Sequence, residues 1–389
     1  MPIQLKRRLF ITGMGTSLAG CAGGNWARQS NPLSASFLPE NKFVPMKIGL
    51  ENLVRITVCT RPFRDKGPRL EAEQIAQKPV IHNYGHGGAG WSLSWGCAIE
   101  ASMLARQSGA RSFAVIGAGV IGLTTALRLI ETGANVTLYA KDFPSETRSA
   151  RATGVWSPSS RIGLGDVVDP DFADRWERWA RQSFAVHQRY VGTIGNPVEW
   201  RKSYLFRDEP RASRTPPSRD FLHLRRRVRD LTPPWANIEQ NAHPFNADTA
   251  RGGIGMIFNV AAYSQRLKQD FLLNGGKMVR REFAARQEIL ALPEECIVNC
   301  TGYEAKKLWG DDRLEPVRGQ INWLSPQSDV EYGLYYNNVS AISRSDGLIV
   351  QYTGPNEDFG FGIENETPDR EEMMKAFDIL APLFAPKFI

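Results

Sequence analysis

The sequence predicts an α/β protein of two domains whose segments alternate along the chain. Its length of 389 residues exceeds the ~150 residues of one typical domain and fits two. A short apolar strand at 113–116 runs into a Gly-x-Gly-x-x-Gly turn and a helix, the pattern of a Rossmann-like nucleotide-binding domain. Apolar segments at 320–324, 332–343 and 348–353 are typical of strands, which indicates a second domain with a mixed or antiparallel sheet.

Composition places the chain among ordinary folded proteins. Hydrophobic residues make up 42% and charged residues 23%, which excludes wholesale disorder and fibrous repeats. No apolar run approaches the ~20 residues that a membrane-spanning helix needs. The five cysteines and five histidines are scattered without metal-binding spacing, so we expect neither a disulfide scaffold nor a metal site.

The net charge of +7 would suit a nucleic-acid partner. Much of the excess lies between Arg201 and Arg229, including three consecutive arginines at 225–227. Prolines and an aspartate interrupt this stretch, and it contains no recognisable nucleic-acid-binding module. We therefore interpret it as a solvated, partly irregular surface insertion and expect no nucleic-acid partner.

The N-terminus has the layout of a bacterial export signal followed by a tether. A basic segment at 6–8, containing a twin-arginine-like pair, precedes a short apolar stretch at 9–20. The residues before Cys21 are similar to a lipoprotein cleavage box. Residues 1–24 would then be the signal and residues 25–45 a flexible tether, and the protein would be periplasmic, anchored to a membrane by a lipidated Cys21. A cytosolic N-terminal strand with a chance arginine pair is the alternative.

The Gly-x-Gly-x-x-Gly turn predicts a phosphate-binding site. Gly117 permits the tight turn, Gly119 lets the backbone approach a pyrophosphate, and Gly122 lets the helix pack close to the strand. Free amides and the positive end of the helix dipole favour an anion at the helix start. A strand-to-helix turn that holds no nucleotide is the alternative.

The acidic residue that usually ends the second strand of such a unit is displaced. The strand predicted at 135–140 is followed by Lys141 and only then by Asp142. Asp142 is a candidate for binding a ribose hydroxyl, and a structural surface acid is the alternative.

A second glycine cluster precedes the first. Gly85, Gly87, Gly88 and Gly90 lie between an apolar strand and a helix predicted at 98–106. Four glycines in six positions indicate that the backbone itself approaches a planar or charged group, whose negative charge its amides could stabilise.

Other residues of these segments are predicted to be structural. His82 and His86 lack metal spacing and are expected to make hydrogen bonds, and Trp91 and Trp95 are expected to pack in the core. Cys59 and Cys97 are expected to be buried structural thiols, and covalent attachment of a ligand is the alternative. We expect helices over 176–190 and 258–273. A buried strand is expected at 296–300, with two cysteines on one face rather than in a disulfide.

Several segments resemble the FAD-dependent D-amino-acid oxidase and D-aspartate oxidase family. The matching blocks are TRPFRDKGPRLE (60–71), IHNYGHGGAGWSLSWGCAIEA (81–101), FAVIGAGVIGLTTA (113–126), RSARATGVWSP (148–158), IVNCTGYEA (297–305) and EPVRGQI (315–321). The similarity runs from about Lys47 to the C-terminus. It implies FAD as the cofactor, a D-amino acid or related amine as the substrate and O2 as the electron acceptor.

The order of these blocks differs from the order in that family. There the TRPxR and GHGG segments close the chain, and the glycine-rich turn opens it. Here residues 46–108 resemble the family's C-terminal portion and residues 112–389 its N-terminal remainder. We interpret this order as a circular permutation joined at 107–110, with the new ends outside the nucleotide site.

The resemblance also implies roles for individual residues. Arg61 matches the arginine that clamps the substrate carboxylate, and a surface arginine is the alternative. Gly88 matches a position whose carbonyl receives the substrate amine, and Tyr336 a tyrosine that lines the substrate pocket, with Tyr335 as the adjacent contender. The residues expected to contact FAD are Gly85, Gly87, Gly90, Trp91, Ser92, Gly117, Gly119, Val120, Ile121, Gly122, Asp142, Arg148, Ser149, Thr153, Gly154, Trp156, Thr301 and Gly302.

The chemistry implied by the resemblance is hydride transfer from the substrate Cα to flavin N5. The resulting imino acid hydrolyses to a keto acid and ammonia, and O2 is reduced to H2O2. This chemistry needs positioning more than it needs a strong base. A dehydrogenase that passes electrons to a membrane acceptor, and a flavoprotein that has lost turnover, are the alternatives.

Two residues depart from the family pattern. Ser340 stands where the family has a second tyrosine that bonds the carboxylate, and Ala89 replaces a tyrosine common in the GHGG block. A lost hydrogen bond to a charged partner is worth ~1–3 kcal/mol. We therefore expect weaker binding of simple D-amino acids, a different substrate, or another residue in that place.

These observations predict the domain boundaries. Residues 76–160 and 276–319 are expected to form the FAD-binding domain. Residues 46–75, 161–275 and 320–389 are expected to form the substrate domain.

Overall fold

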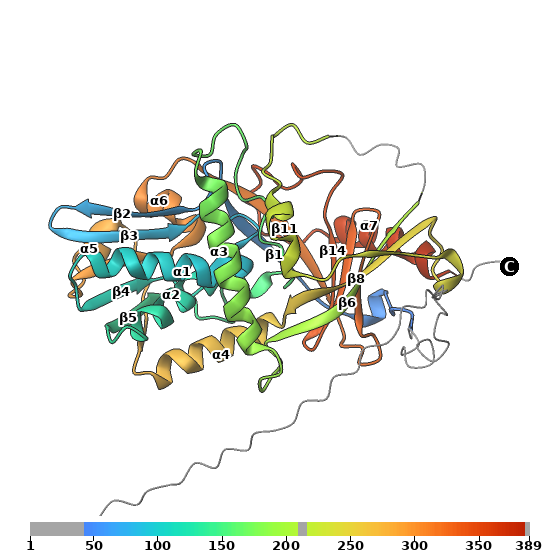
Figure 1. The fold of residues 1–389 in the computed structure, drawn as a ribbon, viewed down its shortest axis with the longest axis horizontal. Helices are drawn as coiled ribbons and strands as arrows, with labels where there is room; N and C mark the ends of the chain where they lie inside the picture. The colour runs from blue at the N-terminus through green and yellow to red at the C-terminus, as the bar shows by residue number, and fades with distance from the viewer. Residues whose placement is uncertain (1–42, 209–215, 386–389) are drawn as a thin grey trace, which may run out of the picture. The chain divides into compact units, whose positions relative to one another are not determined.

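Two β-sheets organise the residues that the structure, a computed structural model, describes: 43–208 and 216–385 (Figure 1). The predicted export signal at 1–24, with Cys21, lies outside these residues and stays a prediction, as does most of the tether. Within the described ranges, no helix has both the length and the apolar character needed to cross a membrane.

The smaller sheet contains the parallel strands expected of a nucleotide-binding domain. Its order is β2 (Arg69–Ile75), β3 (Lys78–Tyr84), β10 (Cys296–Asn299), β4 (Ser112–Ile116), β5 (Asn135–Ala140) and β9 (Lys277–Arg280). From β3 to β9 every neighbouring pair is parallel, and β2 pairs antiparallel with β3 at one edge. Segments far apart in the sequence therefore lie side by side in one sheet.

Helices cover both faces of this sheet. They are α1 (Gly90–Gln107), α2 (Val120–Ile130), α3 (Phe172–His187), α4 (Val260–Leu273), α5 (Arg286–Leu290) and α6 (Ala305–Trp309). α1 and α2 pack on one face, with α3 against α1 and α4 against α2, and α5 and α6 pack on the other (Figure 1). Because successive side chains of a strand point to opposite faces, Phe113 of β4 joins the first core and Ala114 the second. Both faces of the sheet are thus buried, as is usual for parallel sheets.

The larger sheet has eight strands. Its order is β1 (Leu53–Arg64), β11 (Leu314–Leu324), β14 (Gly347–Tyr352), β13 (Val339–Arg344), β12 (Tyr332–Tyr336), β6 (Val198–Arg207), β8 (Thr249–Phe258) and β7 (Ala236–Ile238). Only β12 and β6 are parallel neighbours. Helix α7 (Arg370–Leu380) packs on β13 and β14 (Figure 1). The predicted α/β class with a mixed second sheet is confirmed.

The segment 332–343 is a hairpin and not the continuous strand that the sequence indicated. β12 and β13 are joined at Asn337 and Asn338, whose φ angles are +42° and +69°. Two successive left-handed residues make the tight turn that matches the twist of paired strands, and asparagine adopts this conformation more readily than most residues. The Asn-Asn pair is the signal that this expectation overlooked.

The described parts of the basic stretch 201–229 include regular elements that were not expected from the sequence. Its first part belongs to β6, and Leu224–Leu231 is a 3-10 helix. Arg227 pairs with Glu177 of α3, and Arg181 of α3 pairs with Asp230. Some of the charged residues in this segment therefore form ion pairs that attach it to α3.

The four described cysteines are buried and free, and none forms a disulfide. Cys296 and Cys300 belong to the same apolar cluster beside α1 and α2. Burial raises the pKa of the Cys300 thiol to about 12, which keeps the thiol protonated.

Close packing of α1 on α3 generates a stability prediction. A Cβ on Gly96 would lie 2.2 Å from the carbonyl oxygen of Trp179, a residue whose side chain is buried. Gly96→Ala should therefore lower the free energy of unfolding by about 1–3 kcal/mol, the usual range for overpacking. Thermal unfolding followed by circular dichroism measures this loss. Met103→Ala on the exposed side of α1 is the control, and equal melting temperatures for the two variants would contradict the prediction.

Candidate functional site

The carboxyl ends of five parallel strands open into one cavity. β3 is followed by Gly85, β4 by Gly117, β5 by Lys141, and β9 by Arg281, and all four residues line this cavity. Cys300, directly after β10, lines it too. In open α/β sheets this edge is where ligands bind.

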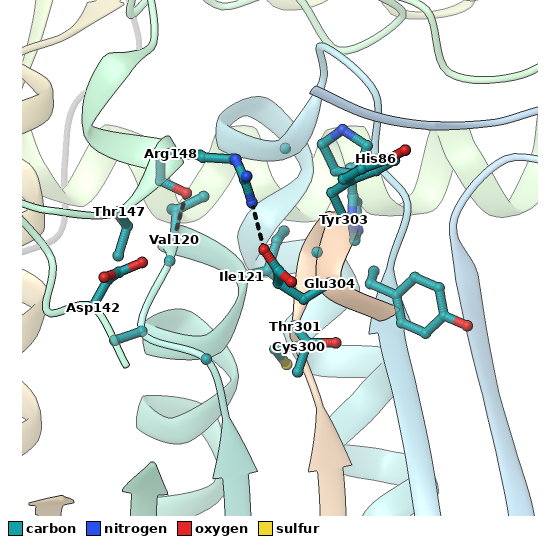
Figure 2. Close-up of a pocket in the computed structure, with 18 of the residues that line it drawn as sticks. His86, Val120, Ile121, Asp142, Thr147, Arg148, Cys300, Thr301, Tyr303 and Glu304 are labelled. Atoms are coloured by element: carbon teal, nitrogen blue, oxygen red, sulfur yellow. Dashed lines mark hydrogen bonds and ion pairs between the residues drawn. The ribbon is translucent and has the colours of Figure 1, made fainter. Parts of the chain in front are cut away.

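The turn between β4 and α2 brings backbone amides to the cavity. Gly117 has a φ of +109°, and a Cβ there would lie 2.5 Å from the carbonyl oxygen of Cys300. A Cβ on Gly122 would lie 1.8 Å from the Gly117 carbonyl oxygen, so the first turn of α2 starts directly against the strand end. The Val120 amide at the start of α2 donates to Ser149 Oγ over 3.1 Å (Figure 2). The helix N-terminus therefore faces a space suited to a phosphate group.

The second glycine cluster lines the same cavity. Gly85 and Gly87 have φ angles of +86° and +53°, and Gly85, Gly87, Gly88 and Gly90 all border the cavity. The amide of Gly87 donates to the Pro62 carbonyl of β1 over 2.8 Å. Two glycine-rich segments, separated by a whole helix in the sequence, thus face one space.

A third wall comes from the segment after β5. Arg148 hydrogen bonds to Glu366 (Nε to Oε1, 2.6 Å) and to Glu304 (Nη1 to Oε1, 3.1 Å), and Figure 2 shows Arg148 and Glu304 extending toward each other. Burial alone would raise the pKa of Glu366, but its hydrogen bond to Arg148 and the charge of that arginine outweigh burial and lower it. Arg148 is thus held by two ionised carboxylates at the cavity wall.

The residues at this cavity fit a bound dinucleotide. His86 and Asn83 both line it, and His86 Nε2 and Asn83 Oδ1 are buried without a hydrogen-bond partner among the described residues. Burial lowers the pKa of His86 to about 3, so its ring is neutral at physiological pH. Unpaired buried polar atoms are costly, so these two indicate that a ligand supplies their partners. By contrast, His82 is satisfied by Glu73 and Asn299.

A second cavity meets the first. Arg61, Gly88 and Thr153 line both. The second cavity is further lined by polar residues of the larger sheet and of the loop that follows Thr153, among them Ser160, Arg161, Arg318, Tyr335, Ser340 and Gln351. Arg61 extends over β11, where a Cβ on Gly319 would lie 2.4 Å from its guanidinium. Gly319 therefore provides the space that this side chain occupies.

Tyr335, and not Tyr336, faces the second cavity. Tyr335 and its cross-strand partner Ser340 both line it. Tyr336 is buried in the core against α7 and donates its hydroxyl to Asp208 over 2.6 Å. Because adjacent residues of a strand point to opposite faces, only one of the two tyrosines can face the cavity. The prediction that Tyr336 lines the pocket is therefore wrong, and the adjacent contender takes that place.

The other residues predicted to contact FAD fall into two groups: most line a cavity, and a few lie behind its wall. Those that line the first cavity are Gly85, Gly87, Gly90, Trp91, Gly117, Gly119, Val120, Ile121, Asp142, Arg148, Ser149, Thr153, Thr301 and Gly302. Trp156 lines the second cavity instead. Ser92, Gly122 and Gly154 line neither. Ser92 Oγ accepts from the Ser157 amide over 2.8 Å, and a Cβ on Gly154 would lie 2.3 Å from the Phe258 carbonyl oxygen. These three shape the backbone behind the walls.

Several cavity residues were not predicted from the sequence. They include Tyr139, Lys141, Arg281, Glu282, Phe283 and Glu304. Lys141 directly follows a predicted strand, so the rule that ligands bind at strand ends could have found it. The same rule could not have found Arg281, because β9 has only four residues and two of them are charged.

The glycine turn generates a prediction about cofactor binding. Gly122→Ala should displace the Gly117 carbonyl and weaken binding of the expected flavin dinucleotide by about tenfold or more, equivalent to about 1.4 kcal/mol. Flavin absorbance after equilibrium dialysis measures this loss. The control is Gly133→Ala just after α2, where a Cβ meets open space and a φ of +83° costs only stability, about 1–2 kcal/mol. Equal flavin affinity in the two variants would contradict the proposed role of Gly122.

Comparison with known proteins identifies relatives of this chain. The D-amino-acid oxidase of Dictyostelium discoideum is 25% identical over 278 residues, which is 70% of this chain and 73% of the relative. The D-amino acid oxidase of Dugesia ryukyuensis is 25% identical over 61% of this chain and 68% of the relative. A 58-residue segment is 43% identical to human D-aspartate oxidase, covering 14% of this chain and 17% of the relative.

Two solved structures of oxidases also match this chain, both with TM-scores below 0.5. The iminodiacetate oxidase of Chelativorans sp. BNC1 matches with a TM-score of 0.48 at 14% identity, over 70% of this chain and 78% of that one. The glycine oxidase of Geobacillus kaustophilus matches with a TM-score of 0.48 at 13% identity, over 70% and 77% of the two chains.

The family assignment comes from a model that covers most of the chain. Residues 112–388 match the DAO family model, described as FAD dependent oxidoreductase. The match begins at β4 and includes the glycine turn, whereas the cavity residues between 59 and 91 precede it. This chain belongs to the DAO family of FAD-dependent oxidoreductases, and its cofactor is FAD.

Proposed function

We propose that this flavoprotein is an oxidase of D-amino acids. It would convert the substrate and O2 to an imino acid and H2O2, and the imino acid would hydrolyse to a keto acid and ammonia. The observation that carries the proposal is the meeting of two cavities at Arg61, Gly88 and Thr153. Relatives named D-amino-acid oxidase support a substrate that is an amino acid or amine.

The first cavity supplies the groups that would hold FAD. The Gly119 amide, together with the Ser149 hydroxyl that accepts from the Val120 amide, would bind the pyrophosphate. Asp142 lies on the wall where a ribose would sit. The loop 85–88 would contact the flavin ring, with Asn83 and His86 as hydrogen-bonding groups. When bound, FAD supplies a two-electron acceptor for the hydrogen at the substrate Cα.

Residues at the junction would bind and orient the substrate. The guanidinium of Arg61 makes no ion pair with another described residue, so it is available to bind a carboxylate through two parallel hydrogen bonds. The carbonyl of Gly88 would accept a hydrogen bond from the substrate amine. Tyr335, opposite Ser340, would close the far side of the pocket. Positioning of this kind supplies much of the rate in a reaction that needs no strong protein base.

The proposed reaction predicts which compounds reduce the enzyme. Anaerobic stopped-flow mixing should show flavin bleaching with D-amino acids and none with their L-enantiomers. In air, each substrate consumed should yield one H2O2. Electron transfer to dyes or quinones without peroxide would instead indicate a dehydrogenase, and a yellow protein that no amine reduces would indicate lost turnover. Either outcome would contradict an oxidase.

Arg61 provides the matched mutational test of the proposed function. Arg61→Met should lower kcat/KM by about 100-fold at unchanged flavin content, because one charged hydrogen-bonding partner is lost. Arg178→Met on the exposed side of α3 removes the same charge elsewhere and should leave kcat/KM unchanged. Equal kcat/KM in the two variants would exclude Arg61 as the carboxylate clamp.

We further propose that the order of segments is a circular permutation of the family's order. Residues 53–107 supply β1 to β3 and α1, yet they precede the matched region 112–388. Permutation needs neighbouring ends, and Phe43 and Phe384 both pack on Phe245, with ring centroids 5.2 Å and 5.7 Å away. The residues between α1 and β4, at 108–111, would be the join.

Rearranging the chain tests this interpretation. A chain that starts at residue 111, joins 385 to 43 through a short Gly/Ser linker and ends at 107 should fold, bind FAD and keep its activity. Flavin content and the melting temperature, compared with those of the natural order, measure the outcome. Failure to bind FAD would contradict the permutation.

A further inference from the structure

The second cavity contains two half-buried arginines, Arg61 and Arg161, that lack an ion-pair partner among the described residues. The guanidinium of Arg61 makes neither a hydrogen bond nor an ion pair with another described residue. Arg161 makes one hydrogen bond, from Nε to the carbonyl oxygen of Glu357 over 2.9 Å, and no ion pair. The terminal nitrogens of both guanidinium groups are therefore available to a ligand. Buried or partly buried charges are normally paired, so these two need an explanation.

One glycine loop fixes both arginines. The amide of Gly87 donates to the carbonyl of Pro62, which follows Arg61, over 2.8 Å. The amide of Gly88 donates to the carbonyl of Ser160, which precedes Arg161, over 3.0 Å. A Cβ on Gly87 would lie 1.9 Å from the Arg161 carbonyl oxygen. Consecutive amides thus hold the two arginine-bearing segments on the same loop.

The Arg161 backbone is held in an unfavourable conformation. Its φ is +48°, in the left-handed region that residues other than glycine, asparagine and aspartate rarely adopt. Burial and then the positive charge of Arg61 lower the pKa of Arg161 to about 10, against the opposing effect of two nearby carboxylates. A strained backbone and the proximity of a like charge, without a direct ion pair, are typical of binding sites rather than of structural support.

The remaining charges of the cavity do not neutralise these arginines. Among its lining residues the single acid is Glu357, whose carboxylate lies 3.4 Å from His223. Arg318 is already paired with Glu372 outside the cavity lining. The cavity also includes Arg225 and Arg229, so its net charge is strongly positive.

We propose that the substrate carries a carboxylate on its side chain, which Arg161 binds while Arg61 binds the α-carboxylate. The substrate class is the acidic D-amino acids, and the inference rests on the proposed function. Arg61 borders both cavities, whereas Arg161 borders only the second, so a side chain extending away from the flavin would reach Arg161. A second charge-assisted contact also offsets the hydrogen bond lost at Ser340.

The test compares acids with their neutral isosteres. Anaerobic flavin reduction is measured with D-aspartate and D-asparagine, and with D-glutamate and D-glutamine. The acid should be favoured about 10- to 100-fold in kcat/KM in at least one pair, the range for one charged hydrogen-bonding contact. Arg161→Gln should remove this preference by lowering kcat/KM for the acid. The surface control Arg178→Gln should keep the preference.

A binding measurement keeps the proposal falsifiable if the Arg161→Gln variant does not fold. Malonate should perturb the flavin spectrum of the wild-type enzyme at concentrations at least about tenfold lower than propanoate does. Equal kcat/KM for acids and amides, equal affinity for malonate and propanoate, or an undiminished acid preference in Arg161→Gln would each overturn the proposal.

These outcomes separate the inference from the proposed function. Reduction by neutral D-amino acids as fast as by acidic ones would leave the oxidase proposal intact and overturn the acidic substrate. Tight malonate binding without reduction by any D-amino acid would support the paired arginines and contradict the oxidase.

Discussion

The structure depends on backbone contacts that only glycine allows. Gly117 and Gly122 let β4, β10 and α2 meet without intervening side chains, and Gly87 lets its loop touch the Arg161 carbonyl. Each of these contacts would place a Cβ within 2.5 Å of a carbonyl oxygen. Because side chains are excluded there, amides and carbonyls form the surface that faces the ligand. The cofactor cavity, the junction of the two cavities and the placement of both arginines follow from this close approach.

The long strand β1 connects these contacts to the substrate side. It pairs with β11 along its length, and near its carboxyl end it receives the Gly87 amide beside Arg61. One strand therefore belongs to the larger sheet and also positions the proposed carboxylate clamp at the mouth of the cofactor cavity. Thr153 and Gly88 complete the junction from two other segments. Arg61 is thus held by a strand of the larger sheet, which favours a fixed orientation of its guanidinium.

The sequence predicted the cofactor side better than the substrate side. The glycine positions and the strand-turn-helix pattern have local physical causes, so the residues alone indicated that both segments approach a ligand, and the family resemblance assigned both to FAD. The choice between Tyr335 and Tyr336 depends on strand register, which a shift of one residue reverses. Arg161 matches no motif and lies in a loop, and its importance comes from contacts with Gly87 and Arg61 that only the folded chain reveals. β9, with two charged residues among four, carries no strand signal of its own.

The central claim is that two glycine-rich segments, at 85–90 and 117–122, hold the same FAD molecule. A crystal structure of the FAD-loaded protein tests this claim most directly. The account predicts pyrophosphate oxygens within hydrogen-bond distance of amides at the start of α2, and the isoalloxazine ring against residues 85–88, with Arg61 beyond it. A flavin bound at only one of these segments, or bound away from the junction of the two cavities, would contradict the account.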